Sequence, residues 1–147
     1  MYDASPRPIL MADDDPDDRL LLQEAFQEAG LSSPLFFVED GEELMDFLRR
    51  QGRHHEHESP MPGLILLDLN MPRKDGREAL REIRADRALR RIPIVILTTS
   101  KSEEDILRSY DMGANSYITK PVSFESLVKV VDLLGRYWLQ TVELPPS

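Results

Sequence analysis

The sequence predicts an α/β protein built on a doubly wound, parallel sheet of five strands with five helices. Two observations support this fold class. Short apolar runs alternate with longer helical patterns from residue 8 to about residue 140, and most of the runs are almost continuously apolar. Continuous apolar strands are typical of parallel sheets covered on both faces, and alternating strands and helices imply right-handed crossovers. The 147 residues suffice for one domain with its own core.

Five apolar runs are expected to form the strands, and the first four are rich in aliphatic residues. The fifth is more polar, which is typical of a strand at the edge of a sheet. The runs are 9–12, 35–38, 64–67, 94–97 and 116–119.

The helices lie after these runs. In the first, Asp15 is expected to be the N-cap, Pro16 to occupy the first helical position and Gly30 to stop the helix. Its predicted apolar face consists of Leu21, Leu22, Ala25, Phe26 and Ala29. Apolar residues at helical spacing mark the other four: Leu44, Phe47 and Leu48; Leu80 and Ile83; Ile106, Leu107 and Tyr110, ended by Gly113; and a last helix from about Ser123 towards Gln140.

The composition excludes several classes of function. Without cysteine the chain can form no disulfide, thiol nucleophile or thiolate zinc site. A net charge of −9 opposes binding to nucleic acid. No apolar run approaches the roughly 20 residues of a membrane span, and the N-terminus does not resemble a signal peptide, so a cytoplasmic location is expected. His54, His55 and His57 all lie in one polar stretch, which leaves no histidine base near a strand end. The stretch is expected to be a solvated loop, where metal binding would be adventitious rather than physiological.

Polar residues follow four of the five strands, at the sheet edge where doubly wound proteins bind ligands. These residues are Asp13, Asp14 and Asp15 after the first run, Asp68 after the third, Thr98, Thr99 and Ser100 after the fourth, and Lys120 after the fifth. After the second run, Glu39, Asp40 and Gly41 look like a simple turn into a helix.

Crowded carboxylates repel one another, and oxygen ligands without histidine or thiolate favour Mg²⁺. Lys120 can grip a phosphoryl oxygen, Thr98 can donate a hydrogen bond to it, and Asp68 can attack phosphorus. An aspartate triplet alone is usually a helix cap, and Lys-Pro is usually a turn. Because all these features stand at strand ends, they predict phosphoryl transfer onto a carboxylate.

At this point the chain resembles the receiver domains of bacterial two-component response regulators. The motifs that carry the resemblance are ILMADDDPDD, LILLDLNMPRKDG, IPIVILTTS and GANSYITKP, which follow in the family's order over roughly residues 7 to 135. The resemblance implies a flavodoxin-like sheet with strand order 2-1-3-4-5. It makes residues 7–140 the receiver domain and 141–147 a short tail.

The resemblance also implies the roles of individual residues. Asp68 would be the phosphoacceptor, and Asp13, Asp14, Asp68 and the backbone carbonyl of Asn70 would hold Mg²⁺. Thr98 and Lys120 would contact the phosphoryl group.

Phosphorylation is expected to draw Thr98 towards the phosphoryl group and to let Tyr117, the aromatic switch residue, turn inward. Asn70 and Ser100 occupy the positions that tune the lifetime of the phosphoryl group in the family. The chain would not be an enzyme beyond catalysing its own phosphorylation and slow autodephosphorylation.

Two segments are similar to a narrower group, the small single-domain regulators that pair with phytochrome-type histidine kinases. They are RRQGRHHEHESPMPG before the third strand and YWLQTVELP near the end. No DNA-binding output domain is expected, so the output would be a changed protein–protein surface. We expect a homodimer through the fourth helix, fifth strand and fifth helix, because the last helix carries more than one apolar stripe, with Tyr137 and Trp138 as interface anchors.

Three alternatives remain. A phosphatase with an aspartate nucleophile usually needs a second acid two residues later, where this chain has Asn70. A nucleotide-binding switch would need a Gly-rich phosphate loop, which follows none of the runs. A receiver relic that no longer accepts phosphate would have lost some of the chemical positions, all of which are filled here. The sequence leaves three roles open for the phosphorylated chain: an end-point regulator, a shuttle in a phosphorelay, or a phosphate sink that drains its kinase.

Overall fold

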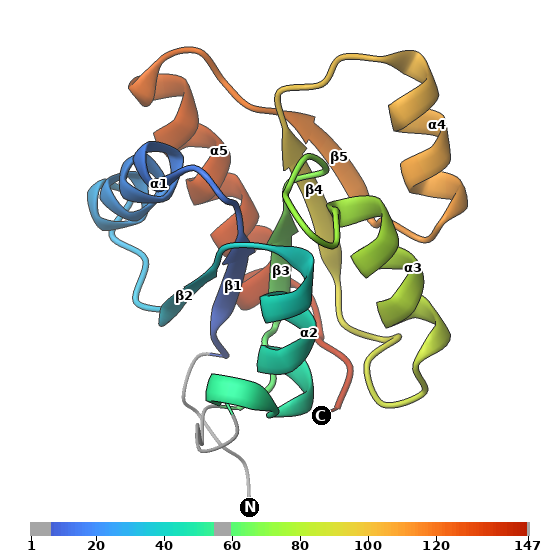
Figure 1. Cartoon of the computed structure of the whole chain (residues 1–147). Helices are drawn as coiled ribbons and strands as arrows, with labels where there is room; N and C mark the ends of the chain where they lie inside the picture. The colour runs from blue at the N-terminus through green and yellow to red at the C-terminus, as the bar shows by residue number, and fades with distance from the viewer. Residues whose placement is uncertain (1–6, 55–59, 147) are drawn as a thin grey trace, which may run out of the picture.

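The computed structural model of the chain describes residues 7–54 and 60–146. It contains the predicted five-stranded parallel sheet in the order β2-β1-β3-β4-β5 (Figure 1). The strands are β1 (Ile9–Ala12), β2 (Leu35–Val38), β3 (Leu64–Leu67), β4 (Ile94–Thr98) and β5 (Ser116–Thr119). The helices are α1 (Pro16–Glu28), α2 (Gly41–Arg49), α3 (Gly76–Ala85), α4 (Glu103–Asp111) and α5 (Phe124–Arg136). The predicted fold class and strand order are therefore confirmed.

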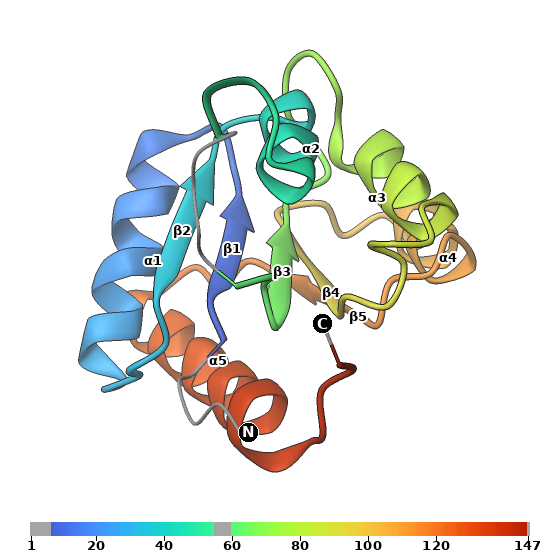
Figure 2. The same ribbon diagram turned by 90° about the horizontal axis from the view of Figure 1, so that it is seen from below.

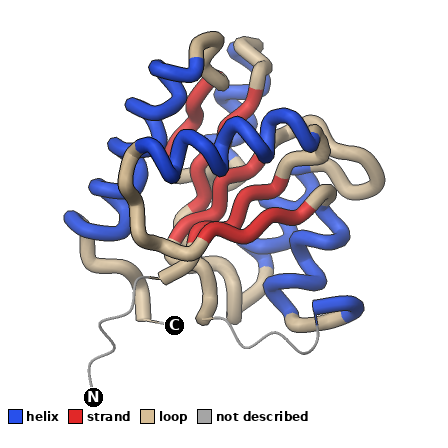
Figure 3. Tube along the Cα trace, turned by 90° about the vertical axis from the view of Figure 1, so that its left-hand side faces the viewer, coloured by secondary structure: helices blue, strands red, loops and turns tan. Residues whose placement is uncertain are grey.

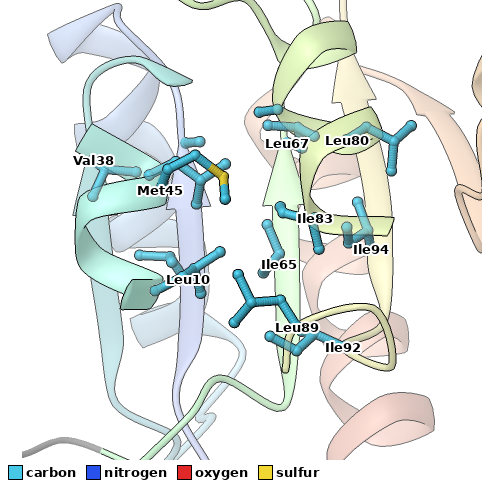
Figure 4. Packing of buried hydrophobic residues seen from close by; sticks show 14 of the residues in the cluster. Leu10, Val38, Met45, Ile65, Leu67, Leu80, Ile83, Leu89, Ile92 and Ile94 are labelled. Atoms are coloured by element: carbon cyan, nitrogen blue, oxygen red, sulfur yellow. The ribbon is translucent and has the colours of Figure 1, made fainter. Parts of the chain in front are cut away.

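Helices cover both faces of the sheet and make three layers (Figures 2 and 3). α1 and α5 pack on one face, whereas α2 and α3 cover the other. Each face buries its own apolar cluster, and Figure 4 shows the cluster beneath α2 and α3. Its labelled members are Leu10, Val38, Met45, Ile65, Leu67, Leu80, Ile83, Leu89, Ile92 and Ile94.

Short polar side chains start every one of the five helices. Each N-cap side chain accepts a hydrogen bond from a backbone N–H in the first turn, which satisfies a donor that the helix itself cannot pair. The caps are Asp15, Asp40, Asp75, Ser102 and Ser123. The predicted turn at Asp40 is thus a helix cap. Gly30 and Gly113 follow α1 and α4 with positive φ angles of 72° and 103°, as expected of residues that end helices.

Two predicted helices form but bury only part of their apolar pattern. Leu21 belongs to the predicted apolar face of α1 but is 43% exposed, because the buried stripe runs through Leu22, Ala25 and Phe26. In α4, Leu107 and Tyr110 are exposed, and the one buried residue is Ser109. α4 packs mainly against β5 at the sheet edge, so its pattern is not a core stripe.

The last helix runs to Arg136 and continues as one π-helical turn, Tyr137–Thr141. A short 3₁₀ helix, Gly52–His54, precedes the segment that contains His55 and His57, which lie outside the described residues. His54 itself contacts Glu43, with 2.9 Å between Nε2 and Oε2. None of the described helices is long and apolar enough to cross a membrane.

Candidate functional site

The polar residues predicted at the strand ends come together at one edge of the sheet, the upper edge in Figure 1. The parallel registers explain why. Ala12 of β1 pairs with Leu67 of β3, so Asp13 and Asp68 leave the sheet side by side. In the same way, Thr98 of β4 pairs with Thr119 of β5, directly before Lys120.

Three carboxylates form the centre of this site. The side chains of Asp13, Asp14 and Asp68 each offer an oxygen, and these oxygens all lie within 4.8 Å of one another. Asp13 and Asp68 are buried, whereas Asp14 is exposed. The set fits a hard divalent cation: its ligands are all oxygens, they converge, and the exposed member leaves room for water or phosphate.

Lys120 reaches into the same carboxylate group. Its Nζ lies 2.7 Å from Asp13, 2.8 Å from Asp18 and 2.9 Å from Asp68. Asp18 is a site residue that its sequence position does not predict, because an aspartate in the first turn of α1 looks like an ordinary partner of the helix dipole. The one available signal was its place in the run DDDPDD, one turn after the triplet.

Burial and ion pairing act against each other at this site. Burial raises the pKa of Asp13, and the hydrogen bond from Lys120 only partly offsets that effect. Burial lowers the pKa of Lys120, but hydrogen bonds to Asp13, Asp18 and Asp68 outweigh it, so this pKa lies above its usual value. A raised pKa of Asp13 favours its protonated form, whereas a raised pKa of Lys120 favours the charged ammonium. Asp13 and Lys120 form an ionised pair, because an ammonium shared by three carboxylates holds its proton firmly.

Thr98 and Asp68 are already joined. The fully buried Thr98 hydroxyl donates to Asp68 Oδ1 over 2.7 Å, and the backbone N–H of Asn70 donates to the same oxygen over 3.3 Å. The expected approach of Thr98 towards a phosphoryl group therefore starts from a hydroxyl that already lies beside the candidate acceptor carboxylate.

Tyr117 and Ser100 lie next to each other beside this centre. The Tyr117 hydroxyl donates to the backbone carbonyl of Ser100 over 2.9 Å, and its ring is partly buried against the apolar cluster. The Ser100 hydroxyl donates to Asp105 at the start of α4 over 2.7 Å. Arg77 of α3 donates to the same Asp105. The loop after β4 is thus tied to α3, α4 and β5.

A glycine missed by the sequence analysis fixes the loop after β3. A Cβ on Gly76 would lie 2.1 Å from the carbonyl oxygen of Asp68, so no side chain fits there. The Gly76 N–H also donates to the carbonyl of Leu69 over 3.0 Å. The start of α3 can therefore press against the backbone of the candidate acceptor only with glycine at this position.

A cavity of 230 Å³ opens beside Lys120. Its walls are mostly apolar and come from β1, α1, the end of β4, the loop after β5 and α5. The lining residues are Met11, Asp13, Asp18, Leu21, Leu22, Leu97, Thr99, Lys120, Pro121, Val122 and Leu127. The exposed Leu21 thus belongs to the surroundings of the site.

Comparison with known proteins agrees with this geometry. The family model described as response regulator receiver domain matches residues 9–132. The response regulator Rcp1 of Synechocystis sp. (strain ATCC 27184 / PCC 6803 / Kazusa) is 44% identical over 142 residues, which are 97% of this chain and 95% of Rcp1.

Two solved structures are similar over almost the whole chain. The Mn²⁺-bound form of Rcp1 has a TM-score of 0.85 and 43% identity, with 96% of this chain and 100% of that one covered. The phosphorylated cyanobacterial phytochrome response regulator RcpA has a TM-score of 0.88 and 42% identity, with 97% and 100% covered.

Proposed function

The chain belongs to the response regulator receiver domain family, and from this premise we propose that it accepts a phosphoryl group from a histidine kinase on Asp68. One observation carries the proposal. Each oxygen of the Asp68 carboxylate has its own donor, Thr98 on Oδ1 and Lys120 on Oδ2, while two further carboxylates converge beside it.

In the proposed reaction, an oxygen of Asp68 bonds to the phosphorus of a phosphohistidine on the kinase. The phosphorus–nitrogen bond breaks, the imidazole nitrogen keeps the electron pair and takes a proton from solvent water, and Asp68 becomes an acyl phosphate. Lys120 and the Thr98 hydroxyl donate to the transferring oxygens, so the chain contributes mainly positioning and electrostatic stabilisation. Attack by water on the same phosphorus would return the free carboxylate, as slow autodephosphorylation.

Asp13, Asp14 and Asp68, whose carboxylate oxygens converge, are proposed to hold a divalent cation in this reaction. The backbone carbonyl of Asn70 is proposed as a further ligand. We propose Mg²⁺, which would neutralise charge on the phosphoryl oxygens. With these carboxylates neutralised, Lys120 can give up one of its three contacts and donate to the phosphoryl group instead.

The partner kinase is proposed to be of the phytochrome type, as the similarity to RcpA supports. Its approach would be over the apolar surface at the 230 Å³ cavity, whose lining includes the exposed Leu21 and Val122. Burial of such side chains would stabilise a complex that brings the phosphohistidine to Asp68. A cytoplasmic location belongs to the same proposal.

The output is proposed to be a changed protein–protein surface on α4, β5 and α5, with Thr98 and Tyr117 as the switch. Exposed apolar side chains on this face, Leu107, Tyr110 and Leu133, suit a homodimer. A cavity of 340 Å³ between β5 and the end of α5 offers further apolar surface for such a dimer contact. Its lining residues are Ser116, Ile118, Val130, Leu133, Leu134, Tyr137 and Trp138. Residues 7–140 are proposed as the receiver unit and 141–147 as its tail.

Labelling with acetyl phosphate and Mg²⁺ tests the acceptor. The wild type is expected to become phosphorylated and Asp68→Asn is expected to remain unlabelled. Asp40→Asn is a matched control, since Asp40 also follows a strand, is equally buried, and keeps a capping oxygen as asparagine. Full labelling of Asp68→Asn would overturn the assignment.

The kinase surface and the dimer are tested separately. Leu21→Ala is expected to slow phosphotransfer from the kinase but not labelling by acetyl phosphate, whereas equal effects on both donors would contradict the proposed surface. Sedimentation of a strict monomer, both with and without phosphorylation, would exclude the homodimer.

A further inference from the structure

A second charged region lies at the opposite end of the sheet, where a cavity of 280 Å³ separates the loop between α3 and β4 from the C-terminal tail. In Figure 1 the tail passes this loop at the lower end of the molecule. The lining residues are Arg7, Met61, Arg87, Ala88, Arg91, Ile92, Pro93, Pro145 and Pro146. None of them belongs to the candidate phosphorylation site.

Among residues 7–54 and 60–146, the arginines of this cavity have no acidic partner. Within the described part of the chain, no ion pair joins Arg7, Arg87 or Arg91 to a carboxylate. Other arginines of the chain do pair, for example Arg49 with Glu82 at 2.7 Å. In a protein of net charge −9, the described residues thus gather three arginines around one cavity without an ion pair between them and a described carboxylate.

Arg7 lines the cavity and is partly buried. Its guanidinium donates to the backbone carbonyls of Met61, Pro62 and Pro145 over 3.3, 3.1 and 2.8 Å. Burial lowers its pKa from the usual value, since carbonyl dipoles replace water without supplying a full negative charge. An anion in the cavity would supply that charge.

The other walls are apolar. Met61, Ile92 and three prolines face the cavity, and the prolines offer no backbone N–H to compete for an anion. Arg87 and Arg91 are exposed at the rim, where their planar guanidinium groups can bind an oxyanion in the bidentate way that arginine favours.

We propose that this cavity binds a small organic anion, with a carboxylate or phosphate group held by Arg87 and Arg91 and a compact apolar body against Met61, Ile92 and Pro145. The volume is at the lower end for ligand pockets, which favours a small molecule over a folded partner. Because Arg7 and the prolines of the tail form two of the walls, the bound anion would also fasten the tail to the rest of the domain.

A titration of the full chain with phenyl phosphate, monitored by NMR, tests this site. EDTA in the buffer removes divalent cations, so the phosphate cannot bind through a metal ion. We expect saturable shifts at residues 87–93, and none with benzyl alcohol, which has the ring but no charge. Benzoate is expected to bind at the same residues, since the site recognises the oxyanion.

Arg87→Gln/Arg91→Gln should weaken binding by about tenfold or more, because both exposed guanidinium groups are lost. Arg108→Gln, an exposed arginine of α4, removes a charge elsewhere and should bind as the wild type does. Asp68→Asn should also bind normally. Absence of saturable binding, equal weakening by Arg108→Gln, or binding of an acidic peptide but neither small anion would each overturn the proposal.

Discussion

The two ends of the sheet handle charge in opposite ways. At the carboxyl end, Lys120 is shared among Asp13, Asp18 and Asp68, so acidic side chains outnumber the cation that holds them. At the amino end, guanidinium groups bind main-chain carbonyls: Arg84, for example, donates to the carbonyls of Gly113, Arg90 and Ile92.

This difference separates the responsive part of the molecule from its scaffold. Carbonyl groups at the amino end are fixed by the backbone, so their bonds to arginine hold loops in place without a metal ion or phosphoryl group. The carboxylates at the other end repel one another, and a cation or phosphoryl group can exchange with the lysine. Four substitutions break or sharpen this contrast.

The largest effect is expected for Lys120→Met. This change leaves the buried Asp13 and Asp68 without their counter-charge, which costs about 3 kcal/mol of unfolding free energy in metal-free buffer. A divalent cation at the same carboxylates should restore much of the loss. Urea unfolding measures the free energy of unfolding of wild type and variant, once with EDTA and once with MgCl₂. A loss of stability that Mg²⁺ does not reduce would contradict the claim that a cation can replace the lysine at these carboxylates.

Arg84→Met is the counterpart at the amino end. The change removes the donors for the carbonyls of Gly113, Arg90 and Ile92, which costs about 2 kcal/mol. Here Mg²⁺ should give no rescue beyond its effect on the wild type. Arg81→Met is the matched control, since exposed Arg81 contacts only a methionine sulfur and should change stability by less than about 0.5 kcal/mol.

Asp14→Asn tests the cation site without disturbing the core. Asp14 is exposed, so the variant should fold as the wild type does, but with one charged ligand fewer it should bind Mg²⁺ about tenfold more weakly. Isothermal titration against Asp17→Asn, an exposed aspartate of the same acidic run, provides the comparison. Similar affinities for the two variants would remove Asp14 from the site.

The smallest effect concerns the contact that ties α4 to its surroundings. Hydrogen bonds from Ser100 and then Arg77 lower the pKa of Asp105. A lowered carboxyl pKa contributes stability above the unfolded-state value and loses it as the pH falls through the folded-state value. Asp105→Asn should therefore lower the free energy of unfolding by about 0.5 kcal/mol at neutral pH. It should lower it by nothing at a pH where Asp105 of the wild type is protonated in both the folded and the unfolded state.

Thermal unfolding from neutral to acidic pH measures this difference, with Asp111→Asn of the same helix as the control. A constant difference between wild type and Asp105→Asn at all pH values would show that the charge of Asp105 contributes nothing.

Sequence patterns predicted all five strands and helices because buried parallel strands and amphipathic helices leave regular signals. The same patterns predicted that one set of polar residues lies together, since the carboxyl ends of parallel strands meet at one edge of the sheet. These residues are Asp13, Asp14, Asp68, Thr98 and Lys120. The roles of these residues in phosphoryl transfer remain predictions.

Features that depend on contacts between distant segments were not predictable in this way. Gly76 is needed because of its approach to the Asp68 carbonyl, and Arg7 reaches Pro145 across 138 positions. Neither contact leaves a local pattern. Leu107 and Tyr110 follow a helical spacing, but whether such a stripe is buried depends on what packs against it.

Reduction of the phosphorylated protein with borohydride, which converts an aspartyl phosphate to homoserine, identifies the acceptor most directly. After labelling by the kinase or by acetyl phosphate, peptide mass spectrometry should find homoserine at residue 68, with Asp13, Asp14 and Asp18 unchanged. Homoserine at one of those three positions, or a labelled protein without homoserine at residue 68, would contradict phosphoryl acceptance by Asp68.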